Sequence, residues 1–126
     1  MLRETEQVIR VNPINTSEGL KDILALLQCK NSPQSIMFPK INSPDEVTLI
    51  DNLLMEFNVS TRIQIIIETN QGLEAAFEIA GISNRTDALF FGGVDMAAEL
   101  RCSSDSDSLL YARSKVVHAA AAAELD

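Results

Sequence analysis

Ile63-Gln64-Ile65-Ile66-Ile67, directly before Glu68, is the most strongly strand-forming run of this 126-residue chain. β-Branched side chains favour strands, and a nearly continuous apolar run is typical of a parallel strand that is covered on both faces. Three other short runs share this composition: Gln7-Val8-Ile9-Arg10-Val11, Ser35-Ile36-Met37-Phe38 and Ala88-Leu89-Phe90-Phe91. We therefore expect four parallel strands, over residues 7–11, 35–38, 63–67 and 88–91.

Segments with helical spacing separate the four runs. The clearest follows Asn42, where Ser43 can cap a helix, Pro44 suits its first position and Glu46 can complete a capping box. We expect further helices from 15–18 to about 27, over 72–80, over 95–100 and from about 109 to 125. The side chains expected on their apolar stripes are Val47, Ile50, Leu54 and Phe57; Leu20, Ile23, Leu24 and Leu27; and Leu73, Ala76, Phe77 and Ala80.

Strands and helices alternate with a regular period. The corresponding strand positions Val8, Ile36, Ile63 and Ala88 are 28, 27 and 25 residues apart. Repeats of this kind predict an α/β fold with about four consecutive βα units and parallel strands, that is, a partial TIM (β/α)8 barrel. At 126 residues the chain has the length of one domain, so we interpret residues 1–126 as a single domain. Because a complete barrel has eight strands and about 250 residues, we expect that domain to be a barrel fragment that lacks the first and last strands.

The composition argues against several classes of protein. A net charge of −8 without a basic cluster would repel nucleic acid. The longest apolar stretches, such as 119–123, are far shorter than the roughly 20 residues of a membrane span. The first seven residues are polar and acidic and do not resemble a signal peptide, so we expect a cytoplasmic protein. Cys29 and Cys102 lack metal-type spacing and are expected to be free thiols.

Polar or flexible residues follow each expected strand at the end where a barrel builds its active site. They are Arg10 and Asn12, then Lys40, then Glu68, and finally Gly92, Gly93 and Asp95. Burying Glu68 after an isoleucine-rich strand is costly unless a cation or hydrogen bonds compensate. Magnesium accepts one or two carboxylates together with water and substrate oxygens. We therefore predict that Glu68 and Asp95 bind Mg²⁺, and that substrate contacts come from Arg10, Asn12, Lys40, Gly92 and Gly93.

Structural roles are the alternative for each of these side chains. Glu68 can pair with Arg10 or Lys40, and Asp95 can cap a helix that begins at Met96. Arg10 can clamp a carboxylate through two parallel hydrogen bonds, or it can form a salt bridge at the end of its strand. His118 lies among alanines in the last helix and is interpreted as a packing or surface residue.

Five segments of the chain resemble the citrate lyase beta subunit family, whose relatives include malyl-CoA and citramalyl-CoA lyases. They occur in the family's order: Ile9-Arg10-Val11-Asn12, Phe38-Pro39-Lys40, Ile67-Glu68-Thr69, the run from Phe91 to Leu100, and the run from Leu109 to Val117. The resemblance implies a TIM barrel that binds magnesium through Glu68 and Asp95. It also implies that Arg10 contacts the carboxylate or carbonyl of the substrate.

The resemblance further implies a reaction. Such enzymes cleave a 3-hydroxy-acyl thioester of the citryl, malyl or citramalyl kind into a 2-oxo acid and an acetyl thioester. The thioester is carried on coenzyme A or on an acyl carrier protein, and we expect a homo-oligomer that can also associate with other lyase subunits. Two alternatives are a non-catalytic barrel fragment or assembly module, and a phosphoenolpyruvate-type barrel enzyme that acts on free oxo acids.

Overall fold

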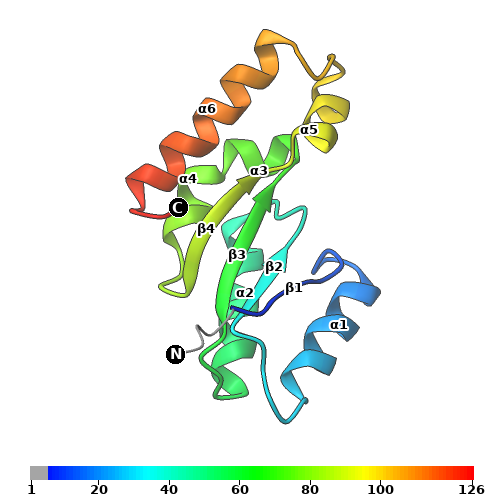
Figure 1. The fold of residues 1–126 in the computed structure, drawn as a ribbon, viewed down its shortest axis with the longest axis vertical. Helices are drawn as coiled ribbons and strands as arrows, with labels where there is room; N and C mark the ends of the chain where they lie inside the picture. Colours follow the sequence, from blue (N-terminus) through cyan, green and yellow to red (C-terminus); the bar gives the residue numbers. More distant parts are fainter. Residues whose placement is uncertain (1–5) are drawn as a thin grey trace, which may run out of the picture.

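The computed structural model describes residues 6–126 and contains one sheet of four parallel strands in the order β1-β2-β3-β4 (Figure 1). The strands are β1 Val8–Arg10, β2 Ser35–Phe38, β3 Arg62–Ile67 and β4 Thr86–Phe91. Their register aligns Ile9, Ile36 and Ile63 across the first three strands. All four expected strands are confirmed, together with the parallel pairing that a βαβ succession predicts.

Six helices lie in the described part of the chain. They are α1 Ser17–Leu27, α2 Pro44–Glu56, α3 Asn70–Glu74, α4 Ala76–Gly81, α5 Gly93–Leu100 and α6 Asp107–Ala122. Ser43 caps α2 as predicted, but Glu46 accepts its hydrogen bond from the N–H of Asn42 rather than from that of Ser43. The prediction of one helix over 72–80 was wrong, because the backbone breaks at Ala75 and forms two short helices, the first capped by Thr69.

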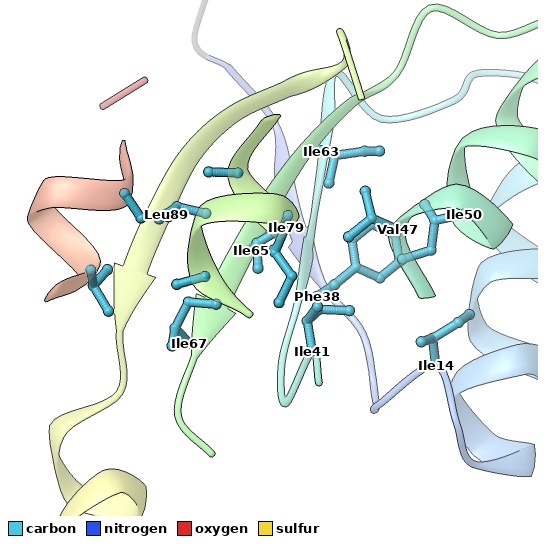
Figure 2. Close-up of a cluster of buried hydrophobic side chains, with 14 of the residues drawn as sticks. Ile14, Phe38, Ile41, Val47, Ile50, Ile63, Ile65, Ile67, Ile79 and Leu89 are labelled. Atoms are coloured by element: carbon cyan, nitrogen blue, oxygen red, sulfur yellow. The ribbon is translucent and has the colours of Figure 1, made fainter. Parts of the chain in front are cut away.

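The core lies between the sheet and the helices. The helix-facing side chains of β2 and β3 are completely buried: Ile36, Phe38, Ile63, Ile65 and Ile67. Val47 and Ile50 from α2 and Ile79 from α4 pack against them (Figure 2). The predicted stripe of α2 is confirmed, since Val47, Ile50 and Leu54 are buried and Phe57 packs against the core.

Some predicted stripe residues are exposed instead. Leu20 and Leu24 flank the buried Ile23 and Leu27 on α1 and are 40% and 37% exposed. Phe77 is 63% exposed on α4, because the break at Ala75 changes the helical phase after α3. On α1 and α4 the buried side is thus narrower than the apolar pattern predicted.

The other face of the sheet is more open. Val8 on β1 and Phe90 on β4 are 39% and 41% exposed, and Gln64 on β3 is partly exposed. In a closed barrel this face would line the interior.

Asp126 lies against the outer edge of β4, where its backbone N–H donates to Asp87 O at 3.1 Å and its carbonyl accepts from Leu89 N at 3.0 Å. Among residues 6–126, no helix has the length and apolar character to cross a bilayer.

Arg85, just before β4, connects α2 and the segment after it to the N-terminal end of the sheet. Its guanidinium donates to Asp51 Oδ1 at 2.9 Å and to the carbonyls of Val59 and Thr61 at 2.8 and 3.0 Å. We expect Arg85→Met to lower the free energy of unfolding by about 2 kcal/mol, because partly buried acceptors lose their donor. Urea denaturation measures this change. Lys115→Met is the control, since its partner Glu74 is 78% exposed and such pairs contribute at most about 1 kcal/mol.

Candidate active site

Glu68 is a buried carboxylate at the C-terminal end of β3. It is 3% exposed, and its Oε2 accepts a hydrogen bond from the backbone N–H of Lys40 at 2.9 Å. Lys40 follows the buried Pro39 and has a φ of 53°, which is uncommon for a residue with a side chain. Such backbone strain is found most often at functional sites. The loop after β2 is therefore shaped so that a main-chain donor faces Glu68.

Gly92 leaves the space that the Glu68 side chain occupies. Its N–H donates to Ile67 O at 3.0 Å, which holds the end of β4 beside the end of β3. A Cβ on Gly92 would lie 2.6 Å from Glu68 Cβ and 2.8 Å from Glu68 Oε1. The requirement for glycine here comes from this close approach, because its φ of −88° is open to any residue.

Asp95 reaches the same place from the first turn of α5. A pocket of about 240 Å³ lies between the strand ends, and its lining residues are Lys40, Glu68, Thr69, Asp95, Ala98 and Glu99. α5 begins at Gly93, so the alternative that Asp95 caps a helix starting at Met96 is wrong. The structure thus brings together the two acids that the sequence singled out.

The two carboxylates influence each other. Burial raises the pKa of Glu68 above its usual value, and a hydrogen bond with Asp95 raises it further. The Lys40 N–H and the positive charge of Arg10 act in the opposite direction. Within residues 6–126, Glu68 forms no salt bridge, so the pairing with Arg10 or Lys40 considered from sequence is absent and Arg10 acts at longer range.

The arrangement suits a magnesium ion. A buried carboxylate beside a second one favours a cation that would neutralise both. In the part of the chain that the structure describes, no cluster of three or more acidic, histidine or cysteine side chains is close enough to hold a metal. Two carboxylates with room for water and substrate oxygens match the preference of Mg²⁺, whereas zinc sites take more nitrogen and sulfur ligands.

Of the other predicted residues, only Lys40 is among those that line this pocket. Arg10 ends β1 and is exposed, and the side chain of Lys40 is exposed at the pocket. Asn12 lies in the loop after β1, where Asp22 Oδ2 accepts from its backbone N–H at 3.0 Å and from its Nδ2 at 2.9 Å. Gly93 opens α5, and His118 is exposed on α6, as expected for a surface residue.

Two further contacts at this rim were not predicted. Thr69 Oγ1 donates to Asn42 Oδ1 at 2.5 Å and accepts from Gly72 N at 3.0 Å, which joins the starts of α2 and α3. Glu99 Oε1 accepts from Asn70 N at 2.9 Å. The spacing of Asp95 and Glu99, four residues apart, was the available signal, because such residues share one face of a helix.

Comparison with known proteins reveals one family. A family model described as HpcH/HpaI aldolase/citrate lyase matches residues 1–126. The chain is 31% identical to the human mitochondrial citramalyl-CoA lyase and 29% identical to citrate lyase subunit beta of Haemophilus influenzae. These alignments cover 92% and 98% of the chain but only 39% and 45% of the relatives, so the chain spans less than half their length.

Solved structures agree with this assignment. RipC from Yersinia pestis superposes with a TM-score of 0.87 at 35% identity, over 94% of this chain and 54% of that protein. The citrate lyase beta subunit of M. tuberculosis, complexed with oxaloacetate and magnesium, superposes with a TM-score of 0.76 at 26% identity, over 94% of this chain and 51% of the other. The four-stranded parallel sheet is therefore similar to part of that family's barrel-like fold.

Proposed function

Because the chain belongs to the HpcH/HpaI aldolase/citrate lyase family, whose members include carbon–carbon lyases, we propose that it carries the magnesium and oxo-acid site of such a lyase. The reaction proposed is cleavage of a 3-hydroxy-acyl thioester into a 2-oxo acid and an acetyl thioester. The observation that supports it is the buried carboxylate of Glu68 beside Asp95, at the rim where parallel strands end.

Glu68 and Asp95 hold the ion, and Mg²⁺ supplies Lewis acidity toward the oxo group of the product acid. The Lys40 N–H and the missing side chain at Gly92 fix the Glu68 carboxylate before the ion arrives. Arg10 lies at the end of β1, near enough to lower the pKa of Glu68, and its guanidinium binds the oxo-acid carboxylate. Lys40, Gly92 and Gly93 complete the rim, while Asn12 anchors the first loop through Asp22.

In the proposed reaction the substrate hydroxyl loses its proton and the adjacent carbon–carbon bond breaks. The electron pair of that bond passes to the acetyl thioester as an enolate, which then takes up a proton. Negative charge develops in this step, and preorganised positive groups stabilise it more than they stabilise the substrate. The positive charge of Arg10, at the end of β1, supplies part of this stabilisation.

The setting of this activity forms part of the proposal. We infer that residues 1–126 are one domain and a portion of a (β/α)8 barrel, in a cytoplasmic protein that assembles with copies of itself or with other lyase subunits. A thioester on coenzyme A or on an acyl carrier protein is the substrate. One relative is a citrate lyase subunit, which supports the proposed assembly with other subunits. A similar M. tuberculosis structure contains magnesium, acetoacetate and coenzyme A, which supports a thioester substrate.

Calorimetry with Mg²⁺, followed by oxaloacetate or pyruvate, tests the proposed function. We expect one ion to bind per chain and the oxo acid to bind more tightly when Mg²⁺ is present, because the ion and Arg10 act on the same ligand. Ca²⁺ and Zn²⁺ serve as comparison ions. A chain that binds no Mg²⁺, or that binds oxo acid equally well with and without it, would contradict the proposal.

Arg10→Ala separates the anion contact from the metal site. We expect oxo-acid affinity to fall roughly 10- to 100-fold, the scale of a lost charge-assisted hydrogen bond, while Mg²⁺ affinity stays nearly the same. Arg113→Ala is the matched control, because Arg113 lies on α6 over the Phe91 ring and its loss changes the net charge equally. Equal losses of metal and oxo-acid binding in Arg10→Ala would indicate a structural role for Arg10.

A further inference from the structure

We propose that Glu99 is a positioning residue that holds Asp95 opposite Glu68 by binding the start of α3, an inference that rests on the proposed magnesium site. Glu99 does not need to touch the ion for this role. Its effect would pass through the position of α5, on which both Asp95 and Glu99 lie. Loss of a group of this kind typically lowers metal affinity by roughly 10- to 100-fold, because the group orients the ligand.

The contact joins the two elements that carry the acids. Glu99 Oε1 accepts from Asn70 N at 2.9 Å, and Asn70 Nδ2 donates to the carbonyl of Glu99 at 3.3 Å. Asn70 opens α3 and stands two residues after Glu68 in the chain. Two hydrogen bonds therefore connect the helix of Asp95 to the backbone beside Glu68.

The geometry of α5 makes this connection effective. Asp95 and Glu99 are four residues apart and share one face of the helix, and both line the pocket between the strand ends. On the opposite side of α5, Ala97 is buried, and the adjacent Met96 is completely buried in the core. A rotation of α5 about this buried side would move Asp95 away from Glu68, and the hydrogen bond to Asn70 opposes that rotation.

Glu99 could also affect magnesium binding through its negative charge alone, without any influence on the position of Asp95. Glu99 is a third acid at this pocket, and its negative charge alone would attract a cation. Positioning of Asp95 requires a side chain long enough to reach Asn70 and an oxygen that accepts its hydrogen bond, whereas attraction of the cation requires only the negative charge. Glutamine retains the reach and the acceptor but loses the charge, and aspartate retains the charge but loses the reach.

Magnesium titrations of Glu99→Gln and Glu99→Asp therefore test the proposal. We expect Glu99→Gln to bind Mg²⁺ within about twofold of the parent chain and Glu99→Asp to bind roughly 10-fold more weakly. Glu78→Ala, an exposed acid on α4, controls for a general loss of negative charge. Thermal unfolding without metal is measured for each variant, so that an affinity loss caused by unfolding is recognised.

Each outcome has a defined meaning. Weak binding by Glu99→Gln together with normal binding by Glu99→Asp would show attraction by charge and overturn the proposal. Normal binding by both variants would show that the contact has no effect on the site and would also overturn it. A parent chain that binds no Mg²⁺ would instead contradict the proposed function. If Glu99→Asp unfolds, Asn70→Pro, which removes the N–H donor at the first position of α3, is expected to reproduce the loss.

Discussion

Gly92→Ala is expected to disrupt the candidate site by displacing the Glu68 side chain. The new Cβ would lie 2.6 Å from Glu68 Cβ and 2.8 Å from Glu68 Oε1, distances at which atoms overlap. Either Glu68 must leave its position or the end of β4 must move away from β3, where Gly92 N donates to Ile67 O. Mg²⁺ affinity should fall roughly 100-fold as the ligand is displaced.

The fold should also lose stability. Overpacking a tight contact typically costs about 1–3 kcal/mol, and Ile66 Cγ2 at 3.3 Å limits the room for relaxation. Urea denaturation without metal gives this cost, and calorimetry gives the metal affinity.

Gly93→Ala provides the matched control at the neighbouring position. A Cβ there would meet Phe91 Cε2 at 3.6 Å, an ordinary van der Waals contact. Because Gly93 is the first residue of α5, where the helical preference for alanine over glycine is smaller than in the interior, alanine should leave stability unchanged or raise it by up to about 0.5 kcal/mol. Similar losses of Mg²⁺ affinity and stability in both variants would show that the Gly-Gly turn, rather than the space beside Glu68, requires glycine.

Much of the fold could be predicted because its signals are local. Runs such as 63–67 carry their strand preference in their own composition, and Ser43 with Pro44 marks a helix start within a few residues. Parallel order then places all strand ends at one edge. The proximity of Glu68 and Asp95 followed from that topology, since Glu68 directly follows β3 and Asp95 lies in the first turn of the helix after β4.

Other features could not be predicted because they depend on contacts distant in sequence. The break at Ala75 places Phe77 in solvent, although its spacing matches that of a buried stripe. The left-handed backbone of Lys40 accompanies a hydrogen bond from its N–H to Glu68, 28 residues away. Likewise, Glu99 gains a role only through Asn70, which comes from a different βα unit.

Glu68→Gln should have opposite effects on stability with and without magnesium. In the metal-free chain, a buried carboxylate beside Asp95 is unfavourable, and its pKa is raised first by burial and then by that neighbour. A neutral amide removes this repulsion and still offers an oxygen to the Lys40 N–H. We expect the free energy of unfolding without metal to rise by about 1 kcal/mol, the scale of one close like-charge contact.

With magnesium the order of stability reverses. Ligand binding to the folded state adds roughly 1.4 kcal/mol when the free ion is at ten times its dissociation constant. The parent chain should gain this increment, whereas Glu68→Gln should gain almost none because it lacks the buried anionic ligand. Urea denaturation at zero and at saturating Mg²⁺ measures both effects in one experiment.

Glu74→Gln is the control for Glu68→Gln, because Glu74 is 78% exposed and forms a salt bridge with Lys115 at the surface. It should respond to Mg²⁺ as the parent chain does, with a metal-free stability within about 0.5 kcal/mol. A destabilised metal-free Glu68→Gln would mean that the carboxylate is held by favourable structural interactions. A normal Mg²⁺ response in that variant would mean that ion binding does not depend on the Glu68 carboxylate, and would contradict its proposed role as a ligand.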